Sequence, residues 1–348
     1  MGTLPWLKAA LASAAVGIAE AMPRYESFFK LGPNFSEPTP HYPEGRCKIL
    51  PGETEARMNT AKLASAYRID NGKHFRLEDI DPADTGHLHS VEDSNEHLQK
   101  YVARTEDLQA KLYAQDRWAL LLIFQAMDAA GKDGTIKHVM SGVNPEGCQV
   151  YSFKTPSDAE LQHDFLWRTT QHLPERGHIG IFNRSYYEEV LVVRVHPEAL
   201  KNEKLPTPLV TKDIWKERFE DIQSFERHMA RNGTVIRKFF LHLSKKEQKK
   251  RFLARLDEPE KNWKFSQADV HEREFWDDYQ KAYEDMIRRT ASKHAPWYVV
   301  PADNKWFTHL VVSAAIVETL QDLNISYPKV DAAKQREIQA ARRTLEKK

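Results

Sequence analysis

The stretch that decides the fold is WALLLIFQAMDAAGKDGTIK, residues 118–137. It begins with a short, wholly apolar run, Trp118–Phe124, of the kind found in strands that a parallel sheet buries on both faces. A glycine-rich turn follows, and then a segment suited to a helix. Strand, glycine-rich turn and helix in this order direct backbone N–H groups and a helix N-terminus at phosphate oxygens. The segment Asp128–Thr135 (DAAGKDGT) is therefore predicted to grip phosphates.

This loop departs from the general phosphate-loop pattern of Gly, four residues, Gly-Lys and then Ser or Thr. Ala126 stands at the first glycine, and Asp133 replaces the hydroxyl that binds magnesium. A plain strand-to-helix turn is the alternative interpretation. Two carboxylates, Asp128 and Asp133, flank Lys132, however, and acids that hold a cation beside a lysine that meets an anion suit a magnesium–phosphate site. The remaining residues of the predicted loop are Ala129, Ala130, Gly131, Gly134 and Thr135.

Outside the loop, strand and helix signals alternate without hairpin signals. Further strands are predicted over 148–153, 178–182, 234–243 and 297–301, and helices over 157–173, from about 185, over 213–232, from 244, and over 269–291 and 305–323. Two capping boxes, Ser157-x-x-Glu160 and Ser244-x-x-Glu247, mark two helix starts. The pattern indicates an α/β fold of three layers, with a five-stranded parallel sheet and helices on both faces.

The chain is predicted to have three parts. Residues 1–66 form an N-terminal extension or arm, residues 67–328 the α/β domain, and residues 329–348 a charged tail, either helical or disordered. The apolar run at 9–21 is too short to span a bilayer. A net charge of +1 argues against a nucleic-acid-coating protein, and two cysteines without a CxxC motif favour a reducing compartment, the cytoplasm.

Two further segments carry positively charged side chains that could bind phosphates. Arg184 follows the strand at 178–182, where parallel strands end beside the loop, and a cation at a helix start is better explained by an anion partner than as a surface side chain. The stretch 244–268 is predicted to form a helical lid, in which Arg251 and Arg255 lie four residues apart on one face. Such arginines suit charge stabilisation during phosphoryl transfer. For the neighbouring lysines, a solvated helix face is the alternative.

Several motifs taken together closely resemble the polyphosphate kinase 2 family over residues 67–328: FQAMDAAGKDGTIKHVMSGVNPEG, DFLWR, IGIFNRSYYEEVLVVRVHPE, RLDEPEKNWKF and APWYVVPADNKW. The resemblance implies a P-loop kinase fold with a lid. It also implies reversible phosphoryl transfer between inorganic polyphosphate and a nucleotide, with Mg²⁺ or alternatively Mn²⁺. Asp128 and Lys132 would be the essential acid and lysine of the loop, Arg184 the catalytic arginine, and Arg251 or Arg255 the lid arginine.

The resemblance extends to substrate range and assembly. Asn183 together with Glu188 is similar to the subgroup, class III, that phosphorylates both nucleoside mono- and diphosphates, AMP to ADP and ADP to ATP. We expect Asp128 to hold the metal with Asp133 or Glu188. Weaker candidates for polyphosphate or acceptor contacts are Lys137, Arg168 and Lys264. The family also implies a homo-oligomer, a dimer or tetramer, without nucleic-acid or membrane partners.

Two other functions are compatible with the same residues. An ATP-dependent nucleotide or small-molecule kinase would share the loop and the lid. A module that binds nucleotide or polyphosphate without turnover is a third interpretation, supported by the missing acid at Asn183. The presence of Asp128, Lys132 and Arg184 together favours turnover.

Overall fold

The computed structural model describes residues 63–346 except 87, 89 and 90. Residues 1–62 of the predicted N-terminal arm lie outside them, so the arm stays a prediction. No helix within the described ranges combines the length and apolar character needed to cross a membrane.

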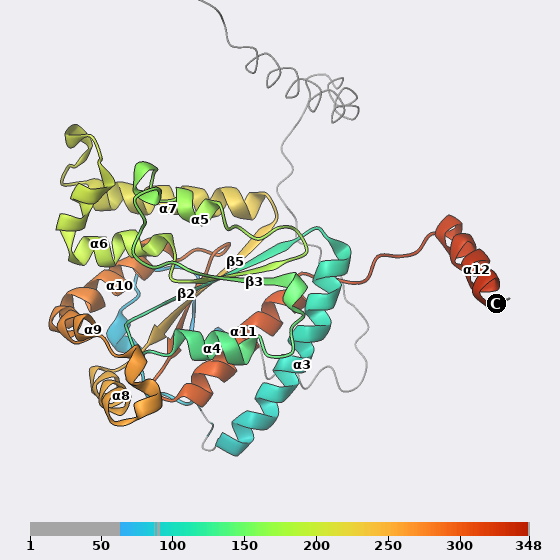
Figure 1. Cartoon of the computed structure of the whole chain (residues 1–348), viewed down its shortest axis with the longest axis horizontal. Coiled ribbons are helices and arrows are strands. Elements are labelled where there is room, and N and C mark those ends of the chain that lie inside the picture. The colour runs from blue at the N-terminus through green and yellow to red at the C-terminus, as the bar shows by residue number, and fades with distance from the viewer. Residues whose placement is uncertain (1–62, 87, 89–90, 347–348) are drawn as a thin grey trace, which may run out of the picture. The chain divides into compact units, whose positions relative to one another are not determined.

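A six-stranded sheet forms the centre of the domain (Figure 1). Its spatial order is β1 (Arg68–Ile69), β6 (Trp297–Pro301), β5 (Thr234–His242), β2 (Ala119–Ala126), β4 (Ile179–Asn183) and β3 (Cys148–Ser152). Strands β2 to β6 pair in parallel, and β1 pairs with β6 in the antiparallel sense. The five predicted strands are confirmed. The sixth, β1, was not predicted because two residues are too few to show a period.

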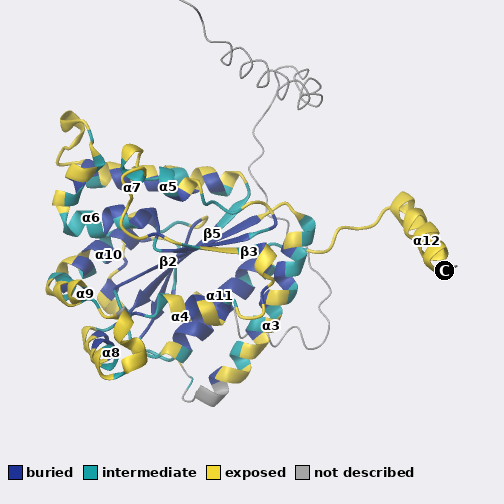
Figure 2. Ribbon diagram, in the orientation of Figure 1, coloured by how far each residue is buried: buried dark blue, intermediate teal, exposed yellow. Residues whose placement is uncertain are grey.

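Helices cover both faces of the sheet (Figures 1 and 2). The helices of the domain are α3 (Val91–Gln115), α4 (Lys132–Val139), α5 (Trp167–Thr170), α6 (Val192–Val195), α7 (Ile214–Arg231), α8 (Lys245–Asp257), α9 (Gln267–Glu272), α10 (Trp276–Thr290) and α11 (Lys305–Asp322). A further helix, α12 (Ala332–Glu346), buries none of its side chains and covers neither face. Alternate side chains of β2 enter two separate cores: Leu120 packs with α3, α4 and α11, and Leu121 packs with α7 and α10. Because both faces are covered, all eight residues of β2 are buried.

The predicted helix over 157–173 is wrong. A 3-10 turn at Glu160–Gln162 and the short α5 replace it, and His163 between them is extended, with φ −119° and ψ 171°. The capping hydrogen bond itself forms, since the Ser157 amide donates to Glu160 Oε2 over 2.7 Å. Most of residues 157–164 are exposed, so a longer helix here would bury no apolar face.

Two other helices differ from the prediction. The chain after Ser185 forms a 3-10 helix, Tyr186–Val190, before α6, and the predicted helix over 269–291 is divided by a 3-10 turn between α9 and α10. The second capping box is only half formed. Ser244 Oγ accepts from the Glu247 amide over 3.1 Å, but the Ser244 amide donates to Asp303 Oδ1 over 2.8 Å. The Glu247 side chain accepts instead from Arg251.

Candidate active site

The predicted phosphate loop connects β2 to α4 through a turn that a plain extended or helical chain could not make. Ala129 has a φ of 64° and Gly131 a φ of 103°, both in the left-handed region that favours glycine. Helix α4 then begins at Lys132, and the Thr135 amide donates its helical hydrogen bond to the Gly131 carbonyl over 2.9 Å. The free amides of this helix start are therefore next to the turn.

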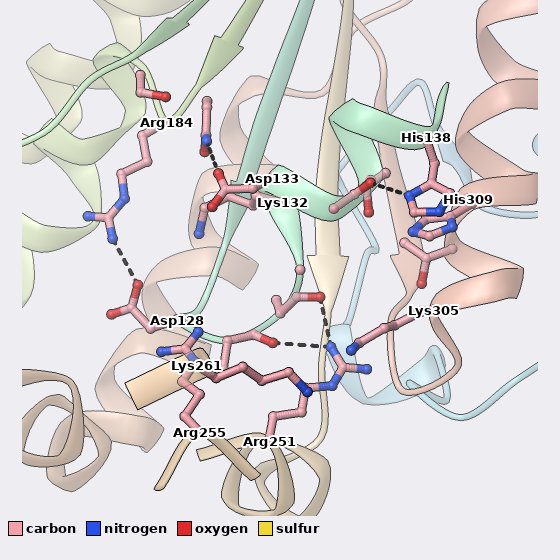
Figure 3. Close-up of a pocket in the computed structure, with 18 of the residues that line it drawn as sticks. Asp128, Lys132, Asp133, His138, Arg184, Arg251, Arg255, Lys261, Lys305 and His309 are labelled. Carbon is pink, nitrogen blue, oxygen red and sulfur yellow. Dashed lines mark hydrogen bonds and ion pairs between the residues drawn. The ribbon is translucent and has the colours of Figure 1, made fainter. Parts of the chain in front are cut away.

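A cavity of about 850 Å³ lies over this loop (Figure 3). It is lined by residues 128–135, His138, residues 152–155, Asn183, Arg184, Arg251, Ala254, Arg255, Lys261, Lys305, Thr308 and His309. Residues that follow β2, β3 and β4 all contribute to it. The cavity therefore occupies the carboxyl edge of the parallel sheet, where ligands bind in open α/β folds.

Lys132 and Asp133 occupy the first turn of α4. Lys132 Nζ donates to the Ala126 carbonyl over 2.9 Å, so the ammonium is held back across the loop. Burial, and then the nearby Arg184, lower the pKa of Lys132, while Asp128, Glu188 and Asp133 act in the opposite direction. Asp133 Oδ1 accepts a hydrogen bond of 2.6 Å from Asn183 Nδ2. An aspartate at 183 could not donate this bond and would place two like charges together.

Arg184 is held at the carboxyl end of β4 in a left-handed conformation, with φ 64°. Its Nη2 donates to Asp128 Oδ1 over 2.8 Å and its Nη1 to Glu188 Oε2 over 3.2 Å. The charge of Glu188, followed by that of Asp128, raises the pKa of Arg184 and outweighs its burial. Gln125 Nε2 donates to the other oxygen of Glu188 over 3.1 Å. Glu188 therefore supports Arg184 and does not itself line the cavity.

The two lid arginines differ in their contacts. Arg251 is 8% exposed and donates to the carbonyls of Ala129 and Ala130 in the loop and of Ala302 and Asp303 after β6. Arg255 makes one ion pair, with Asp269 at 3.2 Å. Arg251 thus joins the predicted phosphate loop to α8, and Arg255 lines the cavity with a single ion pair among the described residues.

The weaker predicted contacts lie elsewhere. Lys137 is exposed on α4 but is not among the lining residues, and Arg168 donates to the Lys154 carbonyl over 2.8 Å. The side chain of Lys264 is outside the described part of the chain. Lys261, which belongs to the basic stretch predicted as a lid, also lines the cavity. Four further lining residues were not predicted as site residues: Lys154, Lys305, His138 and His309. Lys154 and Lys305 could have been found, because each follows the end of a predicted strand.

Asp128 and Asp133 both line the cavity, but the predicted metal set does not form a closed cage. Nowhere in the described ranges do three His, Cys, Asp or Glu side chains converge as a metal would require. One oxygen of each aspartate is engaged, by Arg184 and by Asn183 respectively. Mg²⁺ is usually held by one or two carboxylates together with waters and substrate phosphates. The two aspartates fit such an open site.

Known proteins resemble this chain in sequence and in structure. The family model for polyphosphate kinase 2 matches residues 88–328. An ADP-polyphosphate phosphotransferase from Rhodopseudomonas palustris is 55% identical over 282 residues, which cover 78% of this chain and 98% of that protein. An AMP/ADP-polyphosphate phosphotransferase from Meiothermus ruber is 46% identical over 271 residues, 78% of this chain and 97% of the relative. The crystal structure of polyphosphate kinase 2 from Arthrobacter aurescens TC1 has a TM-score of 0.73 and 39% identity, over 80% of this chain and 96% of that one.

Proposed function

Because the chain belongs to the polyphosphate kinase 2 family, we propose that it transfers the terminal phosphoryl group of inorganic polyphosphate to a nucleotide, with AMP and ADP as acceptors. It is a phosphotransferase and a polyphosphate-dependent nucleotide kinase. One observation supports this chemistry above all: the phosphate loop, Lys132, Arg184 and two carboxylates line a single cavity.

The reaction needs positioning and charge neutralisation more than proton transfer. A nucleotide phosphate oxygen that attacks the terminal phosphoryl group is already ionised at neutral pH, so no strong general base is required. The amides of the loop would hold the phosphoryl group in line. Lys132 and Arg184 would offset the charge that spreads over its oxygens, and Arg255 would add to them from the lid.

Mg²⁺ is the proposed cation, and it would neutralise charge on the phosphate oxygens when bound. Asp128 and Asp133 are the proposed ligands, because both line the cavity. Glu188 is the weaker ligand of the predicted set, since Arg184 and Gln125 already engage both of its oxygens.

The acceptor range is proposed to include both nucleoside mono- and diphosphates. Asn183 is neutral and its amide is used by Asp133, so this edge of the cavity carries one negative charge fewer than an aspartate would give it. Less repulsion would allow acceptors with different numbers of phosphates. The Meiothermus ruber relative, named for both AMP and ADP, supports this range. We further propose a cytoplasmic homo-oligomer, supported by the low cysteine content and the family resemblance.

A donor–acceptor assay tests the proposal. The protein is incubated with Mg²⁺, long-chain polyphosphate and AMP, ADP, GMP or GDP, with nucleoside triphosphate absent. We expect ADP from AMP and ATP from ADP. Activity that requires ATP as the donor would support the rival ATP-dependent kinase, and binding of polyphosphate without product would support the non-catalytic module.

Substitution of Arg184 tests the assigned chemistry. We expect Arg184→Ala to reduce kcat by about 100-fold or more, because a fixed cation facing the transferring group is lost. Alanine also removes a bulky side chain from a left-handed position, so circular dichroism and thermal melting must accompany the kinetics. Near-normal turnover by the folded variant would refute the role, and Arg176→Ala, at an exposed arginine remote from the cavity lining, is the matched control.

A further inference from the structure

The two ends of the cavity differ in chemistry (Figure 3). Asp128 and Arg184 lie at one end, and Lys305, His138 and His309 lie at the other. Among the described lining residues, Asp128 and Asp133 are the only carboxylates, and both bond to residues at the end of β4. The end near Lys305 therefore suits a ligand that is negative along its whole length.

His138 faces this end with a defined hydrogen-bonding pattern. Its Nδ1 lies 2.8 Å from the Gly134 carbonyl oxygen. A carbonyl oxygen can only accept, so Nδ1 carries the hydrogen, and Nε2 of the neutral ring carries a lone pair. The ionised oxygens along a polyphosphate chain also only accept. Neutral His138 thus cannot bond to the chain through Nε2, whereas protonated His138 can donate to it.

His309 sets the ring of His138 in place without competing for the proton. The two rings stack with centroids 4.2 Å apart and an interplanar angle of 19°. His309 is 9% exposed, and burial, followed by the neighbouring His138 and Lys305, lowers the pKa of His309 to about 4. His309 therefore stays neutral near pH 7, whereas the ring of His138 is exposed and open to a ligand.

The surroundings of His138 are cationic or neutral. Helix α11 packs against α4 and contributes His309 and Lys305, and β2, which also packs against α4, carries no charged side chain. Helix α4 itself contributes Lys137 one residue away and Asp133 five residues away, and Asp133 is hydrogen-bonded to Asn183. No carboxylate among these groups would hold the His138 proton before a ligand arrives.

We propose that His138 binds the polyphosphate chain in a proton-dependent manner, at the end of the cavity away from Asp128 and Arg184. The inference rests on the proposed function and adds the path of the polyphosphate. The tail of the polyphosphate leaves the cavity past Lys305 and the two stacked histidines. When the ring of His138 is neutral, binding of the polyphosphate chain takes up a proton at Nε2, because only then can this atom donate to a phosphate oxygen. The KM for polyphosphate consequently rises as the pH increases from 6 to 8.

Proton uptake tests the inference directly. Polyphosphate is titrated calorimetrically into the full-length protein with Mg²⁺ at pH 7.5, in two buffers of different ionisation enthalpy. Wild-type protein should take up a fraction of a proton more per bound chain than His138→Gln does, and His138→Gln should raise the KM for polyphosphate about 5-fold at pH 6.5. His228→Gln, at an exposed histidine of α7, is the control and should match wild type.

A second variant separates the proposal from a structural effect. His138→Lys carries a permanent cation and should bind polyphosphate at pH 8 more tightly than wild type, with proton uptake reduced to the level of His138→Gln. Equal proton uptake by wild type and both variants would overturn the role of His138 while leaving transfer intact. If wild-type protein neither binds polyphosphate nor transfers from it, the proposed function itself fails.

Discussion

Arg251 and Arg255 lie one helical turn apart on α8, yet their contacts give them different roles. Arg251 satisfies four carbonyls that belong to the phosphate loop and to the segment after β6. Among the described residues, Arg255 forms an ion pair only with Asp269. The spacing in the sequence placed both on one face but could not separate them, because the carbonyls that engage Arg251 come from segments more than 50 residues away.

We predict that Arg251→Lys destabilises the protein by about 2 kcal/mol, because lysine cannot reach all the buried carbonyls that arginine bonds. The free energy of unfolding from urea denaturation is the measurement. Lys250→Gln, at a largely exposed position of the same helix, should change it by less than about 0.5 kcal/mol. An Arg251→Lys variant as stable as wild type would show that the carbonyls find other donors.

A second residue-scale feature is a largely buried cluster of two glutamates and one arginine. Glu189 and Glu203 both approach the buried Arg218, at 3.1 Å and 3.0 Å. Burial, and then the charge of Glu203, raise the pKa of Glu189 to about 8, and burial also raises the pKa of Glu203. Two carboxylates therefore share one arginine, and the native state keeps a proton that the unfolded chain releases.

This pair predicts a pH-dependent stability with a definite sign. Between the ordinary glutamate pKa of 4.5 and about 8, the native state binds more protons than the unfolded state, so stability falls as the pH rises through this window. Glu189→Gln should flatten the fall and make the protein more stable than wild type at pH 8.5. The check is thermal melting from pH 5 to 9 with Glu220→Gln, an exposed site, as the control. An unchanged slope in Glu189→Gln would exclude the shared proton.

At the scale of elements, burial on both faces decided which predictions succeeded. Strand β2 was predictable because a continuous apolar run is needed between two cores, and the turn into α4 was predictable because its glycines come soon after that run. The segment 157–173 was not, since its capping pair forms without an apolar face to extend a helix. The stacking of His138 on His309 could not be predicted from the sequence either, because it depends on how α4 packs against α11.

The N-terminal cap of α8, in the predicted lid, leads to a prediction about stability. Ser244 caps the helix through its hydroxyl, and its amide is bonded to Asp303 beside the Arg251 carbonyl contact. Ser244→Ala should lower the free energy of unfolding by about 1 kcal/mol, through the loss of the cap. Ser266→Ala, at the cap of the short α9, should cost less because that helix has only six residues. A larger effect at Ser266 would place the critical cap of the lid at α9.

For the molecule as a whole, charge is concentrated where the substrates are proposed to bind. Seven lysines and arginines and two aspartates line the cavity, whereas the entire chain carries a net charge of only +1. The remainder of the chain is therefore net negative. A polyanion would be attracted to the cavity and repelled by the net charge of the rest of the chain, which agrees with the proposed phosphate-polymer substrate.

The described part of the C-terminal tail, residues 329–346, makes few contacts that the folded domain would need. All described residues from 329 to 346 are exposed, and α12 buries none of its side chains. Its ion pairs, Lys334–Glu337 and Arg342–Glu346, are exposed pairs of the kind that contribute little to stability. The family match also ends at residue 328.

Deletion of residues 329–348 should therefore leave the melting temperature within about 2 °C of wild type and kcat within about twofold, since no buried contact of the domain is lost. Differential scanning calorimetry and the polyphosphate–ADP assay measure the two quantities. Deletion of residues 305–348 is the contrasting truncation: it also removes α11, whose buried face packs against α3 and α4, and should abolish folding. If the shorter deletion alone lowers the melting temperature markedly, α12 packs against protein surface in solution and the tail belongs to the folded unit.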